Sequence, residues 1–158
     1  MTNQDKLQQY QKVMELGSGA TSKVDLVEDI SSHKQYAMKI IKNKPKILKQ
    51  IERETAILQK ISTINSENSQ CPYFVQLHDI IKTNDKIILI LEYISGGDLS
   101  DQILNSQNGY FSEGEARYYF QQLIEAITFL HSNNIYHRDL KLENLLVDSN
   151  GNLRITDF

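Results

Sequence analysis

The stretch HRDLKLEN brings three chemically useful side chains into one short segment. Asp139 offers a carboxylate that could take the proton of a hydroxyl group, and Lys141 offers a cation for a phosphoryl group. Asn144 supplies an oxygen ligand of the kind that Mg²⁺ accepts, and Asp157 is a second candidate ligand at the end of an expected strand at 153–155. These residues indicate phosphoryl-transfer chemistry beside a divalent cation.

Two earlier stretches could serve the same chemistry. Gly17 and Gly19, in GSGATSKV, separate two strand-like runs, and glycine lets backbone N–H groups approach a phosphate closely. A glycine pair in this position is also compatible with an ordinary hairpin. Lys39 lies in an apolar strand, where a lysine is commonly an edge residue. Glu54 on the following helix could pair with it and aim its ammonium group at a nucleotide phosphate.

Strands are expected in the first part of the chain and helices in the last part. Runs rich in β-branched and aliphatic residues, bounded by turn residues, predict five strands. These are Tyr10–Leu16, Lys23–Glu28, Gln35–Ile41, Phe74–Ile81 and Lys86–Tyr93. Apolar residues at helical spacing predict a helix after Pro45, and the polar stretch Ser62–Gln70 is interpreted as a solvated loop. After Gly96–Gly97 the chain is expected to be mostly helical.

The clearest predicted helix is Glu113–His131. Ser112 followed three residues later by Glu115 is a capping box. Between residues 116 and 130, 10 of 15 residues are Ala, Ile, Leu, Phe or Tyr, so the helix is expected to be buried on most sides.

Composition favours a globular domain without nucleic-acid or membrane partners. The 158 residues carry a net charge of −3, whereas a nucleic-acid footprint needs a strong basic excess. The longest apolar run, Ile87–Leu91, is far too short to span a bilayer, and MTNQDKLQQY does not resemble a signal peptide. Cys71 is the single cysteine, which excludes an internal disulfide. An intracellular, cytoplasmic protein is therefore expected.

Together, the motifs resemble the first part of a eukaryotic protein kinase domain. The form H-R-D-L-K-x-x-N is that of the serine/threonine branch, and the resemblance covers Tyr10–Phe158. GSGATSKV and ISGGDL are most similar to the calmodulin-dependent and AMP-activated kinase group, in which serine often replaces the third glycine, as Ser22 does here. The resemblance implies an α+β fold with a five-stranded antiparallel N-lobe carrying one helix, and a truncated, mainly helical C-lobe. It places an N-terminal extension at 1–9, the N-lobe at 10–93, and the hinge and C-lobe at 94–158.

The resemblance also implies a role for each matching residue, with ATP and Mg²⁺ as cofactors. Asp139 would accept the substrate's hydroxyl proton, Lys141 would stabilise the transferring phosphoryl group, and Lys39 would contact the phosphates while pairing with Glu54. Asn144 and Asp157 would hold Mg²⁺. The remaining residues would line the ATP site: Leu16, Gly17, Gly19, Val24, Ala37, Leu91, Glu92, Ile94, Asp98 and Leu146.

The sequence ends in Asp157 and Phe158, which match the first two residues of the family's D-F-G triplet. By resemblance, the activation and substrate-docking segments would follow, so a fragment of a longer serine/threonine kinase is expected. The alternative is a short module that binds ATP or a partner without transferring a phosphoryl group. Asp98 and Glu143 suggest protein substrates with a basic residue upstream of the target Ser or Thr.

Overall fold

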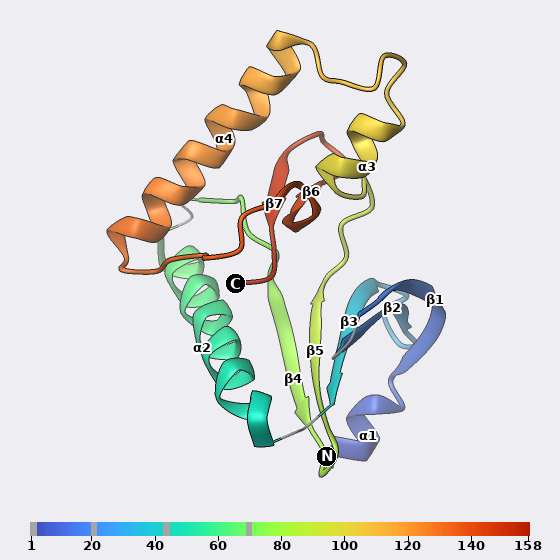
Figure 1. Ribbon diagram of the computed structural model, residues 1–158. Helices are drawn as coiled ribbons and strands as arrows, with labels where there is room; N and C mark the ends of the chain where they lie inside the picture. The colour runs from blue at the N-terminus through green and yellow to red at the C-terminus, as the bar shows by residue number, and fades with distance from the viewer. Residues whose placement is uncertain (1–2, 20–21, 43–44, 69–70) are drawn as a thin grey trace. The chain divides into compact units, whose positions relative to one another are not determined.

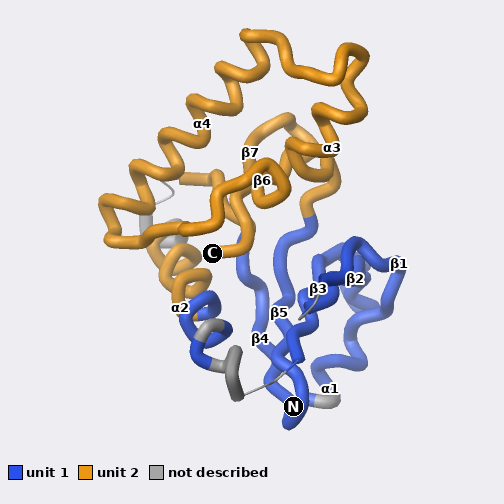
Figure 2. The backbone as a smooth tube through the Cα atoms, in the orientation of Figure 1, with its two compact units in different colours: residues 1–55, 76–93 blue, residues 56–75, 94–158 orange. Residues whose placement is uncertain are grey.

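The chain forms two compact units (Figure 2). The computed structural model describes residues 3–19, 22–42, 45–68 and 71–158. The first unit comprises residues 1–55 and 76–93, and the second comprises residues 56–75 and 94–158.

A five-stranded antiparallel sheet forms the first unit (Figure 1). Its strands, in the spatial order β1-β2-β3-β5-β4, are β1 (Tyr10–Ser18), β2 (Ser22–Asp29), β3 (Gln35–Lys42), β4 (Leu77–Lys82) and β5 (Lys86–Glu92). All five predicted strands are therefore confirmed. The bounds of the fourth differ most, because Phe74 makes an isolated bridge with Ile155 in the second unit and the strand begins at Leu77.

The central strands of the sheet are buried because their residues are mostly apolar. Five consecutive residues of β5, Ile87–Leu91, are buried, as expected for a strand covered on both faces. Tyr36 and Met38 of β3 pack in the same core. A short helix that the sequence did not suggest, α1 (Asn3–Leu7), adds Leu7 to this core.

Helix α2 (Pro45–Asn68) is longer than the sequence predicted. The prediction of a loop at Ser62–Gln70 is wrong for residues 62–68, which are helical, and residues 69–70 lie outside the described part. The stretch contains no Pro or Gly to stop a helix, and buried Ile61 anchors the turn just before it in the second core. Thr63 Oγ1 donates to the Gln59 carbonyl at 3.0 Å, so its hydroxyl is satisfied within the helix.

The second unit combines helices with a small hairpin. Its elements are α3 (Leu99–Leu104), α4 (Glu113–Ser132), the 3₁₀ turn η1 (Leu142–Asn144), β6 (Leu145–Val147) and β7 (Leu153–Ile155). β6 and β7 pair antiparallel, so the region after Gly96–Gly97 contains the predicted helices and the predicted strand at 153–155, together with an unpredicted partner strand. Its core is built around Phe74, Leu130 and Leu153. No helix among the described residues is long and apolar enough to cross a membrane.

Helix α4 has the predicted cap but not the predicted burial. Ser112 Oγ accepts from the Glu115 N–H, and Glu115 Oε2 accepts from the Ser112 N–H at 2.8 Å. Its buried residues are Gln122, Ala126 and Leu130, which share one stripe at a spacing of four, while Phe120 is 60% exposed. The expectation of burial on most sides is therefore wrong for this chain, because one stripe of the helix faces the core.

Gly96 lies where a side chain has no room. Its N–H donates to the Val147 carbonyl at 3.0 Å, and an added Cβ would lie 2.3 Å from that same oxygen. We expect Gly96→Ala to lower the free energy of unfolding by about 1–3 kcal/mol, because the backbone of β6 cannot move aside cheaply. Urea denaturation measures this change.

Gly114→Ala is the matched control. Gly114 lies in the first turn of α4, and its added Cβ would meet one atom, Ser112 Oγ, at 4.0 Å. This substitution should be neutral or stabilise by up to about 1 kcal/mol, because alanine is the better helix former. Equal destabilisation by both variants would contradict the steric argument.

Candidate active site

The structure brings the three side chains of HRDLKLEN into direct contact. Lys141 Nζ lies 3.1 Å from Asp139 Oδ2. Asn144 Nδ2 donates to the backbone carbonyl of Asp139 at 2.8 Å and to its Oδ2 at 3.1 Å. A carboxylate, an ammonium group and an amide therefore meet within one loop of the second unit.

The charges of this loop reinforce each other. The hydrogen bond from Lys141, aided by the one from Asn144, holds the pKa of Asp139 below its ordinary value. The same contact with Asp139 raises the pKa of Lys141. Both side chains are exposed. At neutral pH the loop thus presents an ionised carboxylate beside a cation, both accessible to a large substrate.

His137 ties this loop to the segment that ends in Asp157. Its buried ring donates from Nε2 to the Thr156 carbonyl at 2.8 Å, since a carbonyl can only accept. Nδ1 then accepts the Asp139 N–H at 3.3 Å, so both bonds fit one neutral tautomer. A third bond, from the Thr156 N–H to the Asn144 carbonyl at 3.1 Å, holds the same residue on its other side. The residue before Asp157 is therefore held on both its donor and its acceptor.

Two residues here have a backbone conformation that is uncommon for non-glycine residues. Arg138 has φ of 68° and Asp157 has φ of 60°, both in the left-handed region. Such conformations cost energy and persist where the surrounding contacts impose them, commonly at functional sites. One precedes Asp139 and the other is the predicted metal ligand, so both lie where a site was expected.

Gln122 is a structural contributor that the sequence reasoning missed. This buried residue of α4 uses Oε1 to accept the N–H of Leu153 in β7 at 2.7 Å. Phe158 closes the same region, with its ring 4.9 Å from that of His137 and 5.9 Å from that of Phe74. The helical pattern around Gln122 gave no signal for this contact, because its partner is a backbone group.

The predicted cation ligands are one amide and one carboxylate. Asn144 is buried and its Nδ2 is committed to Asp139, which makes Oδ1 the atom suited to a cation. Asp157 is exposed at the end of the strand segment. In the described part of the chain, no group of three or more His, Cys, Asp or Glu residues could hold a metal. Two oxygen ligands fit Mg²⁺, which commonly keeps several waters and binds substrate phosphates.

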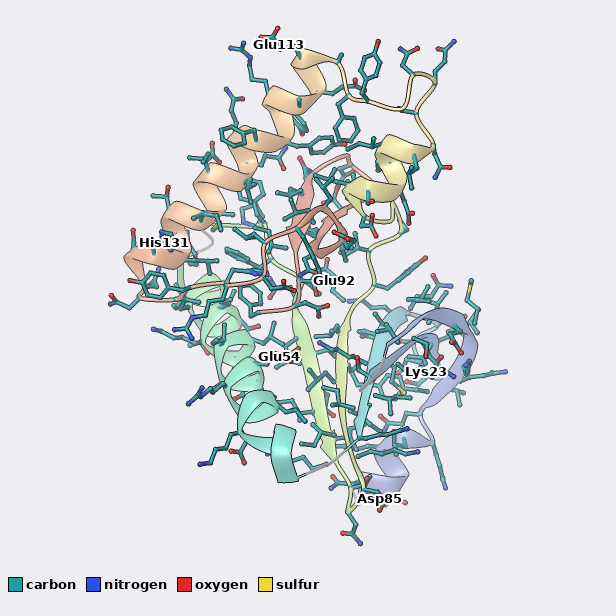
Figure 3. The ribbon with its side chains drawn as sticks, viewed as in Figure 1. Lys23, Glu54, Asp85, Glu92, Glu113 and His131 are labelled. Atoms are coloured by element: carbon teal, nitrogen blue, oxygen red, sulfur yellow. The ribbon has the colours of Figure 1, made fainter. Side chains whose placement is uncertain are left out.

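Lys39 and Glu54 form the expected ion pair in the first unit. Lys39 Nζ lies 2.6 Å from Glu54 Oε1, and each side chain is 12% exposed. Lys39 pairs with Val24 on one side and Leu89 on the other, so it lies inside the sheet and not at its edge. Figure 3 marks Glu54 on α2. Burial makes an opposite charge at hydrogen-bond distance necessary for both side chains, and the pair supplies one to each.

The other predicted nucleotide residues of the first unit lie on β1, β2, β3 and β5, except Gly19, which directly follows β1. Gly17 pairs with Val24, and the Gly19 N–H donates to the Ser22 carbonyl at 2.8 Å. Leu16 also lies on β1, and Ala37 pairs with Leu91. The N–H of Glu92 is bonded to the Gln76 carbonyl at 2.8 Å.

In the second unit, Ile94 is buried and Asp98 makes an isolated bridge with Leu146. The Asp98 side chain accepts the N–H of Asp101 at 2.9 Å and caps α3.

Removal of the Lys141 charge should change the titration of Asp139. We expect Lys141→Met to raise the pKa of Asp139 toward its ordinary value, because the main contact that favours the carboxylate is lost. NMR titration of the carboxyl carbon measures this directly. Lys86→Met, on the β4–β5 hairpin, should leave that pKa unchanged, and an equal pKa in wild type and Lys141→Met would contradict the assignment.

Comparison with known proteins agrees with the geometry. Residues 10–158 match the family model for the protein kinase domain. The chain is 41% identical, over 97% of its length, to CBL-interacting serine/threonine-protein kinase 8 of Arabidopsis thaliana, of which it covers 33%. It is 47% identical, over 90% of its length, to the probable serine/threonine-protein kinase MARK-B of Dictyostelium discoideum, of which it covers 19%. The chain thus spans a third or less of these relatives, and it belongs to the protein kinase family.

Proposed function

We propose that this chain is the nucleotide-binding and catalytic-loop part of an ATP-dependent serine/threonine protein kinase. The complete protein would transfer the γ-phosphoryl group of ATP to a Ser or Thr hydroxyl of a protein substrate. The observation that carries the proposal is the contact of Asp139, Lys141 and Asn144 in one loop tied to the segment of Asp157. Residues 10–93 would be the N-lobe, and residues 94–158 would contain the hinge and the first part of the C-lobe.

Each residue of the loop would have a separate role in phosphoryl transfer. Asp139 is ionised and exposed, so it can orient the substrate hydroxyl and accept its proton. Lys141 carries the charge that would stabilise the phosphoryl group in the transition state, which requires its contact to shift from Asp139 toward the phosphoryl oxygens. Asn144 and Asp157 would hold Mg²⁺, which when bound neutralises phosphate charge.

The first unit would orient the nucleotide. Lys39, held by Glu54, would contact the α- and β-phosphates, and the buried pair gives the ammonium group a fixed direction. Gly17 and Gly19 would cover the phosphates. The base would contact the apolar side chains and backbone of Leu16, Val24, Ala37, Leu91, Glu92, Ile94 and Leu146, and Asp98 would contact the ribose.

Asp139→Asn in the complete protein tests the assigned base. Asparagine keeps the shape and the acceptor that Asn144 uses but cannot take a proton. We expect kcat for a Ser/Thr peptide to fall roughly 10²- to 10⁴-fold, with the affinity for Mg-ATP little changed. Asp85→Asn, in the turn before β5, is the control and should keep full activity (Figure 3). Undiminished kcat in Asp139→Asn would refute the role.

We also propose that Asp98 and Glu143 favour substrates with a basic residue upstream of the target hydroxyl. A peptide library should show enrichment of Arg or Lys there, and Asp98→Asn combined with Glu143→Gln should reduce it by about two- to fivefold. Asn is as good a helix cap as Asp, so α3 keeps its cap while the charge is removed. A wild-type library without basic preference would reject this part of the proposal and leave the reaction itself untouched.

A further inference from the structure

Strand β1 has little burial to fix its register. It is the edge strand of the sheet, and every residue after Tyr10 is exposed. A strand with one buried face is locked in register, because a slip by one residue would turn its apolar side chains to water. That constraint is weak here, although β1 carries Leu16 and Gly17, which the proposed function assigns to the nucleotide.

Two bulges in β1 further weaken the constraint on how it pairs with β2. The pairing with β2 shifts between Lys12 and Met14 and again between Glu15 and Gly17. Val13 and Leu16 are therefore the extra residues, each without a directly opposite partner. A bulge changes which face the following side chains occupy, so the direction of Leu16 depends on where the bulges form.

Four charged side chains join the two strands across these bulges. Lys12 Nζ lies 2.8 Å from Asp25 Oδ1, and Lys23 Nζ lies 2.9 Å from Glu15 Oε2. Lys23 Nζ is also 3.4 Å from Asp25 Oδ1. The Asp25 side chain is 7% exposed, so it is a buried carboxylate with two cations beside it. Figure 3 marks Lys23 on this hairpin.

The two ion pairs that cross from β1 to β2 are diagonal to the backbone pairing. Lys12 lies opposite Val27, so its bond to Asp25 crosses the first bulge. Glu15 lies opposite Asp25, so its bond to Lys23 crosses the second bulge.

The geometry of the pairs requires the first bulge, at Val13. Lys23 and Asp25 are two residues apart and share one face of β2. Lys12 and Glu15 are three residues apart and would point to opposite faces in a regular strand. The extra residue Val13 brings them to the same face, where both reach the charges of β2. A strand without the first bulge would place Lys12 and Glu15 on opposite faces and could not present both to Lys23 and Asp25.

We propose that Lys12, Glu15, Lys23 and Asp25 form a charge clasp that fixes the bulged register of β1 and so positions Leu16 and Gly17 for the nucleotide. These four are positioning residues, and the inference rests on the proposed function for its nucleotide. Exposed ion pairs are individually weak, but the buried Asp25 makes loss of its partners costly.

The test compares Lys12→Met/Glu15→Gln with wild type in the full chain. This variant removes one charge of each sign but leaves Lys23 beside Asp25, so the buried carboxylate keeps a partner and folding should survive. The control, Lys86→Met/Glu52→Gln, removes the same charges from exposed positions on β5 and α2. Thermal unfolding checks that all three proteins are folded.

Two measurements then decide the proposal. NMR cross-strand contacts report the pairings of Glu15 with Asp25 and of Gly17 with Val24. Titration calorimetry with adenosine at low and high NaCl reports positioning, because adenosine carries no phosphate and salt can act on its affinity only through the protein. We expect the variant to lose those contacts and to bind adenosine about three- to tenfold more weakly at low salt. The wild-type affinity should fall with salt more than that of the variant.

Retained pairings and unchanged adenosine affinity in the variant would overturn the proposal. Altered pairings with unchanged affinity would also overturn it, since the clasp would then be structural alone. If wild type binds neither adenosine nor Mg-ATP, the proposed kinase function fails, and so does the positioning role. The NMR contacts would still show whether the four charges fix the register.

Discussion

The buried side chain and backbone of Asn144 hold the HRDLKLEN loop of the second unit together. Its amide nitrogen bonds both the backbone and the carboxylate of Asp139, and its carbonyl accepts the N–H of Thr156. The chain thereby joins the loop to the segment of Asp157 through one residue that is 4% exposed. In such a low-dielectric position each bond is strong and an unmade bond is costly, so the arrangement is sharply specified. His137 adds a second connection between the same two segments.

The strands were predictable because their signal is local. Alternating or continuous β-branched residues bounded by turns fix strand and hairpin within a few residues, and β5 shows this most clearly. The extent of α2 was not predictable in the same way. Ser62–Asn68 is polar, but the helix continues because nothing breaks it and Ile61 is anchored in a core that residues 71–155 complete. Tertiary contacts therefore set the end of α2, in a stretch that its polar composition had predicted to be a loop.

The site shows the same division between local and distant information. Asp139, Lys141 and Asn144 lie within six consecutive residues, so one loop conformation suffices to bring them together. The contact from Gln122 to Leu153 joins residues 31 positions apart, and its acceptor bonds a backbone N–H that every residue type except proline possesses. Side-chain chemistry in the sequence can reveal groups that act on a substrate. It cannot reveal which side chain satisfies a distant backbone group.

Each of the two units holds part of the proposed chemistry. Lys39 and Glu54 neutralise each other inside the first unit, and Asp139, Lys141 and Asn144 form their contacts inside the second. Each of these contacts joins residues of one unit, so a substitution that removes one of them acts first on its own cluster. Phosphoryl transfer needs both clusters at once, so the effects of substitutions on its rate are expected to be non-additive. Loss of Lys39 should therefore be measured first in nucleotide binding and loss of the proposed base Asp139 first in the rate of transfer, where the two effects combine.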